Sequence, residues 1–523
     1  MSRQKSERCV VPKARRKPGP TRGIENPGGG KATPVYEQTR QLGLRFETAD
    51  VSGGSPPGVL AEAEWDRSHP ASRGTPKSKR TKNTTSLVTM EEVCERLDSA
   101  LQKVTSNDGA PGPDRQSIES VREHWSDVKS ALQPSLLDGT YAPGAIRRVW
   151  IPKASGGARG LGIPNVVDRV VQEAVRSVLE PLYEPTFHEA SHGFRPGRSC
   201  HTAIAAARTH LEEGYEWVVD LDLESFFDRV HHQRLMARLS ERVTDRRLLV
   251  LIGKMLKAKV ALPNGVRVST EEGVPQGGPL SPLLSNIVLD ELDRELAQRG
   301  HRFVRYADDC NVYVRSERAG QRVMASVTDF LARRMRLTVN AAKSAVARPE
   351  ERHFLGFRLR REPTEGGSEV LLSKRSKDRI DETIRARTPR AWGQTLQGCV
   401  LALNAYLVGW IGFFGICTSG VEGVLSRLDA HIRRRLRAIQ LQHWKTKRTI
   451  ARRLIQLGVA KKSAWRAVYA GRTSCWALSH CPAVDRGLRN AYFAERGLVS
   501  LVDRWKARPQ ALVAPAQLTL ALG

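Results

Sequence analysis

The stretch Phe303-Val304-Arg305-Tyr306-Ala307-Asp308-Asp309-Cys310-Asn311-Val312-Tyr313-Val314 decides the fold of this chain. It places two adjacent carboxylates, Asp308 and Asp309, in the middle of an apolar run with the composition of a β-hairpin. Carboxylates are costly to bury unless something pairs with them. Mg²⁺ is such a partner, because it takes oxygen ligands and prefers one or two carboxylates together with substrate phosphates. The stretch therefore predicts a metal site at the turn of a hairpin.

A second pair of carboxylates lies in the strand predicted over residues 217–223. Asp220 and Asp222 are two residues apart, so they share a face of a regular strand. One of them beside the hairpin would complete a site in which two metal ions, about 3.5–4 Å apart, hold the attacking and leaving oxygens of an in-line displacement. Taken alone, each aspartate is better explained as a turn or capping carboxylate.

Charge and composition narrow the class of function. The 523 residues contain 84 Lys and Arg against 55 Asp and Glu, a formal net charge of +29, and 40% are hydrophobic. The basic surplus predicts a polyanionic partner, with nucleic acid as the first candidate. A small basic packing protein is the alternative, which this much apolar sequence disfavours. The eight cysteines form no Cys-x-x-Cys pair, which favours reduced thiols over a zinc site.

The order of predicted elements indicates an α+β chain followed by a mostly α-helical one. Residues 1–85 are rich in Gly, Pro, Ser and Arg, which predicts a disordered basic arm. Helices are expected over residues 89–104, 166–182, 283–296 and 325–337, and from Lys377 onward. Strands are expected over residues 146–150, 161–163, 217–223 and 354–359, with a hairpin over 303–314.

The uncharged stretch at residues 391–421 could span a bilayer by its length. Its glycines and the basic segments that follow favour instead a buried helix and turn in a soluble domain.

From about residue 109 to about residue 459 the chain resembles the bacterial group II intron reverse transcriptases, also called maturases. The resemblance rests on nine blocks in the family's order, which lie at residues 109–114, 151–164, 168–172, 192–199, 222–228, 273–282, 306–309, 340–343 and 354–357. Among them are His-Gly-Phe-Arg-Pro-Gly-Arg-Ser at 192–199, Gly-Val-Pro-Gln-Gly-Gly-Pro-Leu-Ser-Pro at 273–282 and the Tyr-Ala-Asp-Asp turn at 306–309.

The resemblance implies a right-hand polymerase fold with fingers and palm, followed by an α-helical thumb or maturase domain. The expected units are an N-terminal extension with fingers at residues 86–215, a palm at 216–365, a helical RNA-binding thumb at 366–470 and a short C-terminal extension at 471–523.

The resemblance also implies roles for single residues. In the family the catalytic strand Asp lies five residues before an aromatic, which fits Asp222 and Phe227 and not Asp220. Asp222, Asp308 and Asp309 are thus the implied catalytic residues and ligands of two Mg²⁺ ions. Phe227 resembles the steric gate that blocks a ribose 2′-hydroxyl, with a simple core Phe as the alternative. The other residues implied to bind the nucleotide are Lys153, Arg159, Gln276, Gly277 and Lys343, and solvated charges are the alternative for the basic ones.

Two sets of basic residues are implied to bind RNA. Arg195 and Arg198 are expected at the template backbone, with salt bridges inside the fingers as the alternative. Residues 431–462 carry eleven Lys and Arg and no Asp or Glu, the pattern of phosphate contacts. The residues expected to make these contacts are Arg433, Arg434, Arg437, Lys445, Lys447 and Arg448. A merely soluble pair of basic helices is the alternative.

The implied function is an RNA-dependent DNA polymerase that binds group II intron RNA as a ribonucleoprotein, assists its splicing and copies it into DNA during retromobility. Its implied cofactor is Mg²⁺, its substrates are dNTPs, and a DNA target and a primer are further partners. A splicing-only maturase and a domesticated or other bacterial reverse transcriptase stay open as alternatives.

Residues 461–523 show none of the His, Asn and Cys-pair motifs of the endonuclease that some members carry, so we expect no endonuclease and a primer from elsewhere. We expect a bacterial cytoplasmic protein, associated with the nucleoid when it acts on DNA and not with a membrane. The sequence leaves a homodimer open.

Overall fold

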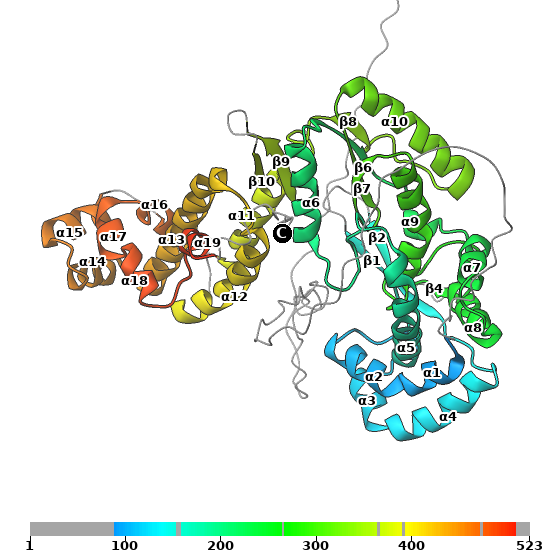
Figure 1. Ribbon diagram of the computed structural model, residues 1–523. Helices are drawn as coiled ribbons and strands as arrows, with labels where there is room; N and C mark the ends of the chain where they lie inside the picture. The colour runs from blue at the N-terminus through cyan, green and yellow to red at the C-terminus, as the bar shows by residue number, and fades with distance from the viewer. Residues whose placement is uncertain are drawn as a thin grey trace, which may run out of the picture. The chain divides into compact units, whose positions relative to one another are not determined.

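A computed structural model of the protein describes residues 88–152, 158–263, 266–362, 367–389, 393–470 and 474–508 (Figure 1). The chain divides into two units, residues 1–74 and 75–523, and every described residue belongs to the second. The arm expected at residues 1–85, Lys153 and the glycine turn predicted at residues 155–157 lie outside the described residues.

Four short helices open the described chain: α1 Met90–Glu95, α2 Leu97–Ser106, α3 Ile118–Glu123 and α4 Trp125–Leu137. Thr89 caps α1, because its hydroxyl accepts a hydrogen bond from the Glu92 N–H at 3.3 Å. The predicted start of the helix is therefore confirmed, although the helix is interrupted at Arg96. Both α1 and α2 pack against α5 Val166–Tyr183.

A four-stranded sheet follows, in the order β2-β1-β4-β5. Its strands are β1 Ile146–Pro152, β2 Ala158–Ile163, β4 Val260–Ala261 and β5 Arg267–Val268. β1 and β2 pair antiparallel as a hairpin, which confirms the two strands predicted there. The two short strands β4 and β5 have no counterpart among the sequence predictions.

The sheet that carries the two aspartate pairs has the order β6-β7-β3-β8. Its strands are β3 Trp217–Leu221, β6 Arg302–Tyr306, β7 Asp309–Val314 and β8 Ala345–Ala347. Because neighbouring residues of a strand point to opposite faces, the sheet joins two cores. Val219 and Val312 belong to a core with helices α9 and α10, whereas Val218 and Tyr313 belong to a core with helix α6.

The helices around this sheet are α6 Cys200–Glu212, α7 His232–Ser240, α8 Arg246–Leu256, α9 Ser281–Gln298 and α10 Glu317–Phe330, with single helical turns at η2 Glu184–Thr186, η3 Phe226–Asp228 and η4 Leu331–Met335. The helix predicted over residues 325–337 in fact begins at Glu317, because the Ser316 hydroxyl caps it by accepting from the Ala319 N–H at 3.3 Å. It ends earlier than predicted as well, and η4 covers the remaining residues.

A two-stranded sheet of β9 Phe357–Arg361 and β10 Ser368–Leu372 leads into the helical part of the chain. The helices are α11 Lys374–Arg387, α12 Leu396–Phe414, α13 Glu422–His443, α14 Lys447–Gln456, α15 Lys461–Tyr469, α16 Cys475–Leu478, α17 Pro482–Gly487, α18 Asn490–Ala494 and α19 Leu501–Lys506, with a short turn η5 Ser419–Val421. The predicted α+β architecture with a helical C-terminal part is confirmed.

Helix α12 forms most of the uncharged stretch. By length and composition alone it is the one helix among the described residues that could cross a membrane. Cys399, Leu403 and Leu407 are fully buried, in a core that includes residues of α11, α13 and β9. This packing supports the buried-helix interpretation.

Candidate active site

The hairpin of β6 and β7 turns within two residues. Tyr306 pairs with Asp309, so Ala307 and Asp308 form the turn. Ala307 has a φ of +56°, which a residue with a side chain adopts at a cost. Gly193 lies directly against this turn, since a Cβ at Gly193 would come within 2.3 Å of the Ala307 nitrogen. The glycine of the 192–199 block is therefore required by the close approach of the catalytic turn.

A fully buried arginine holds the turn from inside the protein. Arg305 forms an ion pair with Asp293 of α9, whose side chain is also fully buried, through Nε at 2.7 Å and Nη2 at 2.5 Å. Its Nη1 donates to the Ala307 carbonyl and to Asn286 Oδ1, each at 3.0 Å. Asn286 in turn donates to the Gly193 carbonyl at 2.8 Å. One network thus joins α9, the 192–199 block and the turn.

Asp222 follows β3 at the same end of the sheet. Leu221 pairs with Cys310, so the next position on each strand brings Asp222 opposite Asp309 and onto the same face. The backbone of Asp222 is held on both sides: its N–H donates to Ser344 Oγ at 2.9 Å, and its carbonyl accepts from the Asn340 N–H at 2.8 Å. The 340–343 block and Ser344 therefore hold the backbone at the end of β3.

The carboxylates of this edge share an environment that disfavours their charges. Burial, followed by the charges of Asp308, Asp220 and Asp222, raises the pKa of Asp309 to about 7. Burial also raises the pKa of Asp308, and the charge of Asp222 adds to the effect. The site thus gathers more negative charge than its own basic residues compensate.

Two basic residues predicted to bind the nucleotide lie beside these carboxylates. Lys343 Nζ is 3.3 Å from Asp222 Oδ2, on a side chain that is 60% exposed. The positive charge of Arg159, on β2, opposes the raised pKa of both Asp308 and Asp309. The fingers hairpin and the 340–343 block therefore both bring positive charge to the aspartates.

The structure separates Asp220 from Asp222. Asp220 Oδ2 accepts from Arg352, with Nε at 2.8 Å and Nη2 at 2.6 Å. Arg352 opposes the rise in the pKa of Asp220 that burial causes. Asp222, at the end of the strand, has only the exposed ammonium of Lys343 as its ion-pair partner among the described residues.

Phe227 lies between the catalytic strand and the loop at residues 273–282. It is partly buried and packs edge-on against the buried Phe226, with 5.3 Å between ring centroids. Its carbonyl accepts from the Val274 N–H at 2.6 Å. Ser225, with a φ of +50°, turns the chain just before the two rings.

Gln276 and Gly277 join this loop to the fingers. The Gln276 carbonyl accepts from the Gly162 N–H at 2.7 Å. Gly277 has a φ of +124°, and a Cβ there would lie 2.4 Å from the Gly162 carbonyl oxygen. The loop therefore lies against β2, the strand that carries Arg159.

Arg195 is engaged inside the fingers. Its side chain is 6% exposed, its Nη2 lies 2.8 Å from Glu184 Oε1, and its Nη1 donates to the Ser191 carbonyl at 2.8 Å. These contacts correct the expectation of a template contact at Arg195 and favour the alternative of salt bridges within the fingers. Arg198, which is partly exposed, donates to the Glu189 carbonyl.

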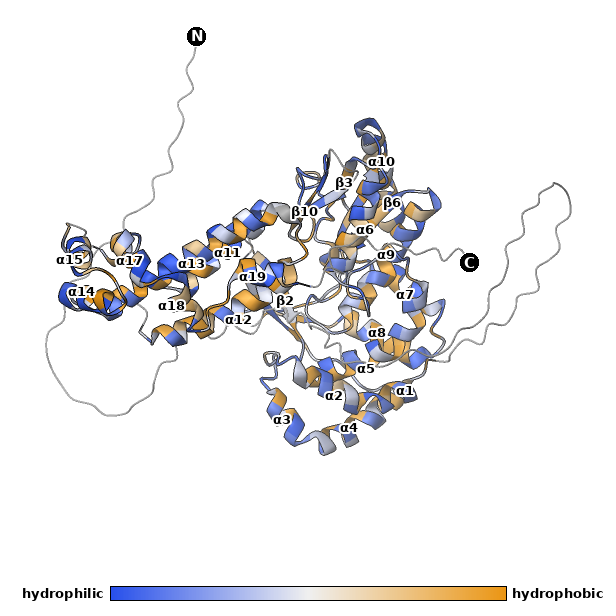
Figure 2. Ribbon diagram, turned by 60° about the vertical axis from the view of Figure 1, so that its left-hand side comes forward, coloured by the Kyte–Doolittle hydropathy of each residue, from blue (hydrophilic) through white to orange (hydrophobic). Residues whose placement is uncertain are grey.

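The basic residues predicted to bind RNA in the helical part fall into two groups, along helices with hydrophilic stretches (Figure 2). On α13, Arg437 pairs with Asp485 at 2.5 Å and donates to the Leu488 carbonyl, which corrects its assignment to RNA. Arg434 lies 4.2 Å from the ring centroid of Trp476, and Arg433 is partly exposed. The second group, at the start of α14, is exposed and comprises Lys445, Lys447 and Arg448.

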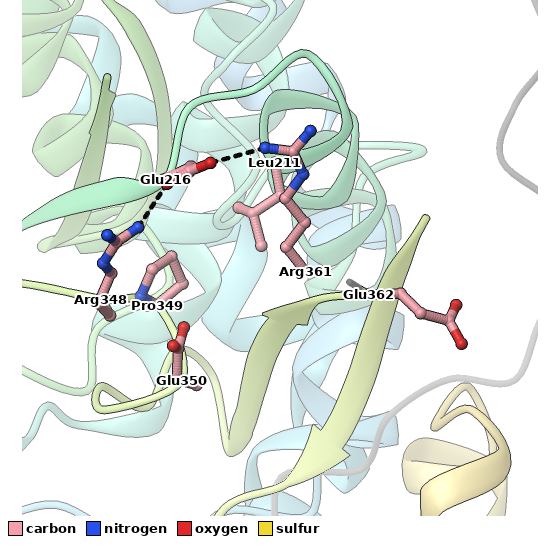
Figure 3. Close-up of a pocket in the computed structure, with 7 residues that line it drawn as sticks. All are labelled: Leu211, Glu216, Arg348, Pro349, Glu350, Arg361 and Glu362. Carbon is pink, nitrogen blue, oxygen red and sulfur yellow. Dashed lines mark hydrogen bonds and ion pairs between the residues drawn. The ribbon is translucent and has the colours of Figure 1, made fainter. Parts of the chain in front are cut away.

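A cavity of about 420 Å³ lies at the opposite end of β3 (Figure 3). Glu216, just before the strand, pairs there with Arg348 at 2.6 Å and with Arg361 at 2.7 Å. The cavity contains none of the predicted site residues, and its Glu216–Arg361 pair links the start of β3 to β9.

The donor set at the edge suits a hard divalent cation, because it consists of carboxylate oxygens, and burial together with the charges of Asp308 and Asp222 raises the pKa of Asp309. Among the described residues, no group of three or more His, Cys, Asp and Glu side chains is arranged so that it could hold a metal ion. Lys343, paired with Asp222, supplies positive charge at this place.

Comparison with known proteins agrees with this geometry. The family described as "Reverse transcriptase (RNA-dependent DNA polymerase)" matches residues 151–359, and the "Group II intron, maturase-specific domain" matches residues 377–456. Protein YkfC of Escherichia coli (strain K12) is 32% identical over 348 residues, 59% of this chain and 91% of that protein. The group II intron-encoded protein LtrA of Lactococcus lactis subsp. cremoris is 42% identical over 209 residues, 39% of this chain and 34% of LtrA.

Among solved structures, a partial Cas6-RT-Cas1–Cas2 complex matches with a TM-score of 0.31 and 24% identity, over 47% of this chain and 42% of that chain. The two family matches define an RNA-dependent DNA polymerase with a maturase domain. The chain belongs to the family of group II intron-encoded reverse transcriptases, which confirms the resemblance drawn from the nine blocks.

Sequence reasoning missed the residues that hold the site in place, namely Arg305, Asp293 and Ser344. One signal was present, because an arginine inside the apolar strand Phe303–Tyr306 must find a buried partner. Nothing in the sequence identified that partner, which lies on a helix twelve residues earlier.

Proposed function

We propose that the chain joins deoxynucleotides to a primer at Asp222, Asp308 and Asp309, which would hold two Mg²⁺ ions. The observation that carries the proposal is the strand register, which brings Asp222 and Asp309 to one face beside the Asp308 turn. Bound ions of this kind supply charge stabilisation for the attacking 3′-hydroxyl and the departing pyrophosphate. The raised pKa of Asp309 supports the proposal, because a cation would compensate both the burial of its charge and the repulsion from the neighbouring carboxylates.

Residues around the triad would bind the incoming dNTP. Arg159 and Lys343, both exposed and beside the carboxylates, suit charge-assisted contacts with the triphosphate. Lys153 is assigned the same role from its place in the fingers block. Gln276 and Gly277 would line the nucleotide from the loop against β2.

The RNA that the enzyme binds would be a group II intron, held as a ribonucleoprotein, spliced with the protein's help and then copied at a DNA target. The maturase-specific match and the exposed Lys445, Lys447 and Arg448 support this proposal. We place this activity in the bacterial cytoplasm and at the nucleoid, and a homodimer is an arrangement to test by light scattering.

Primer extension on an RNA template tests the proposed activity. With a DNA primer, dNTPs and Mg²⁺ the purified chain should produce full-length cDNA, and chelation by EDTA should stop it. Equal extension by the wild type and by Asp308→Asn would contradict the assignment of the site.

Replacement of Phe227 by Ala tests the steric gate. If the ring excludes the 2′-hydroxyl, Phe227→Ala should raise incorporation of ribonucleotides relative to deoxynucleotides by about 10- to 100-fold. Phe227→Tyr, which keeps the ring, should discriminate like the wild type. The measurement is single-nucleotide extension with dNTP or rNTP, and unchanged discrimination in Phe227→Ala would leave Phe227 as a packing residue beside Phe226.

A further inference from the structure

Helix α15 exposes a pair of stacked aromatic rings. Trp465 and Tyr469 are four residues apart and therefore share a face of the helix. Their ring centroids are 5.5 Å apart with 25° between the planes. Trp465 packs against the helical core, whereas Tyr469 is 52% exposed. The exposed face of the Tyr469 ring is therefore open to a ligand that stacks on it.

Positive charge surrounds this pair. Lys447, at the start of α14, has its ammonium 5.5 Å from the centroid of the Tyr469 ring. Arg448 beside it, and Lys461, Lys462 and Arg466 on α15, are exposed. Residues 430–484 contain no Asp or Glu, so no carboxylate of this segment neutralises these charges. An anionic partner therefore fits the positive charge of this surface.

The neighbouring basic residues of α13 are used differently. Arg437 pairs with Asp485, and Arg434 lies over Trp476 at 4.2 Å. Those contacts fasten α13 to α16 and α17. On α14 and α15, where the stacked rings lie, Lys447, Arg448, Lys461, Lys462 and Arg466 are exposed. The match to the maturase-specific domain ends at residue 456, so neither ring falls within it.

We propose that Lys447, Arg448, Trp465 and Tyr469 form a stacking platform for an unpaired base of single-stranded nucleic acid. Aromatic faces accept any base by stacking, and lysines and arginines beside them hold the adjoining phosphates. The base would stack on the exposed Tyr469 ring, which Trp465 supports from below. This inference rests on the proposed function, because it assumes that the ligand is nucleic acid. The platform is a separate site, distant in sequence from the residues of the polymerase site.

Binding of short oligonucleotides to the full-length chain tests the platform. The probes are a fluorescein-labelled, unstructured RNA 12-mer, the DNA 12-mer of the same sequence and an RNA duplex. Tyr469→Ala and Tyr469→Leu should each weaken single-strand binding by about tenfold, and Tyr469→Phe should bind like the wild type. Duplex binding should stay unchanged in all three variants, because its phosphate contacts do not need the ring.

The arms of the experiment separate the alternatives. Equal losses of affinity for the RNA and the DNA 12-mer would indicate a site that accepts either kind of strand. A loss of affinity for the RNA alone would identify unpaired RNA as the ligand. Both results support stacking. Wild-type affinity in Tyr469→Leu would overturn stacking in favour of a simple apolar contact. Wild-type affinity in Tyr469→Ala would overturn the platform and leave the exposed ring to a protein partner.

A second measurement locates the contact directly. An RNA 12-mer with one 5-iodouridine, irradiated in complex with the wild type, should crosslink to the peptide that contains Trp465 or Tyr469. Crosslinks confined to other peptides would overturn the assignment. If the wild type lacks extension but the ring-dependent binding remains, the proposed function fails and the platform stands.

Discussion

Asp222→Asn should reduce primer extension by about a thousandfold or more, because a charged ligand that stabilises the transition state is worth several kcal/mol. Asn keeps the shape of the side chain and the backbone bonds to Ser344 and Asn340, so the loss would report the charge alone. The measurement is the single-turnover rate of nucleotide addition at saturating Mg²⁺.

Asp220→Asn is the matched control for this prediction. Asp220 lies on the same strand and face but is paired with Arg352. Its rate should stay within about tenfold of the wild type, since the variant keeps a hydrogen-bond acceptor for Arg352. Comparable losses in the two variants would show that both carboxylates belong to the metal site.

Arg305→Met should lower the free energy of unfolding by about 3–5 kcal/mol, because it leaves the fully buried Asp293 without a partner. Denaturant unfolding of the metal-free protein measures this change. The variant should also lose polymerase activity, since the Ala307 carbonyl loses the donor that holds the turn.

The double variant Arg305→Met with Asp293→Leu separates the two effects. Removing both charges should recover much of the stability, because a well-packed apolar pair can replace a buried ion pair. Activity should not return, as the turn still lacks its donor. Recovery of both would mean that the network contributes stability only, and that the turn is held by its neighbours.

The structure brings Asp308, Asp309 and Asp222 together at one edge of the sheet, and the sequence signals for this placement are local. Asp308 and Asp309 interrupt an apolar hairpin, and the spacing of Asp222 and Phe227 matched a family block. The sheet that carries them follows from alternation along each strand. The helix over residues 325–337 was misplaced because its start depends on one cap, Ser316, which lies nine residues before the predicted start.

The sequence could not show which acidic residue forms an ion pair with each basic side chain. The composition around Arg195 and Arg437 predicted phosphate contacts, but in the structure they form ion pairs with Glu184 and Asp485. Such pairings depend on how distant segments pack. They are fixed by tertiary structure, and they left Lys445, Lys447 and Arg448 as the exposed members of the predicted set.

The bonds from Ser344 and Asn340 to Asp222 have a consequence for the time at which the enzyme becomes active during its own synthesis. β3 cannot be completed on its outer side until β8, at Ala345–Ala347, has emerged from the ribosome. Since domains fold as their residues become available, a nascent chain that still holds this segment in the exit tunnel has Asp308 and Asp309 but no fixed Asp222. The ribosome must therefore translate well beyond the codon for Asp309 before the protein could copy the RNA that encodes it.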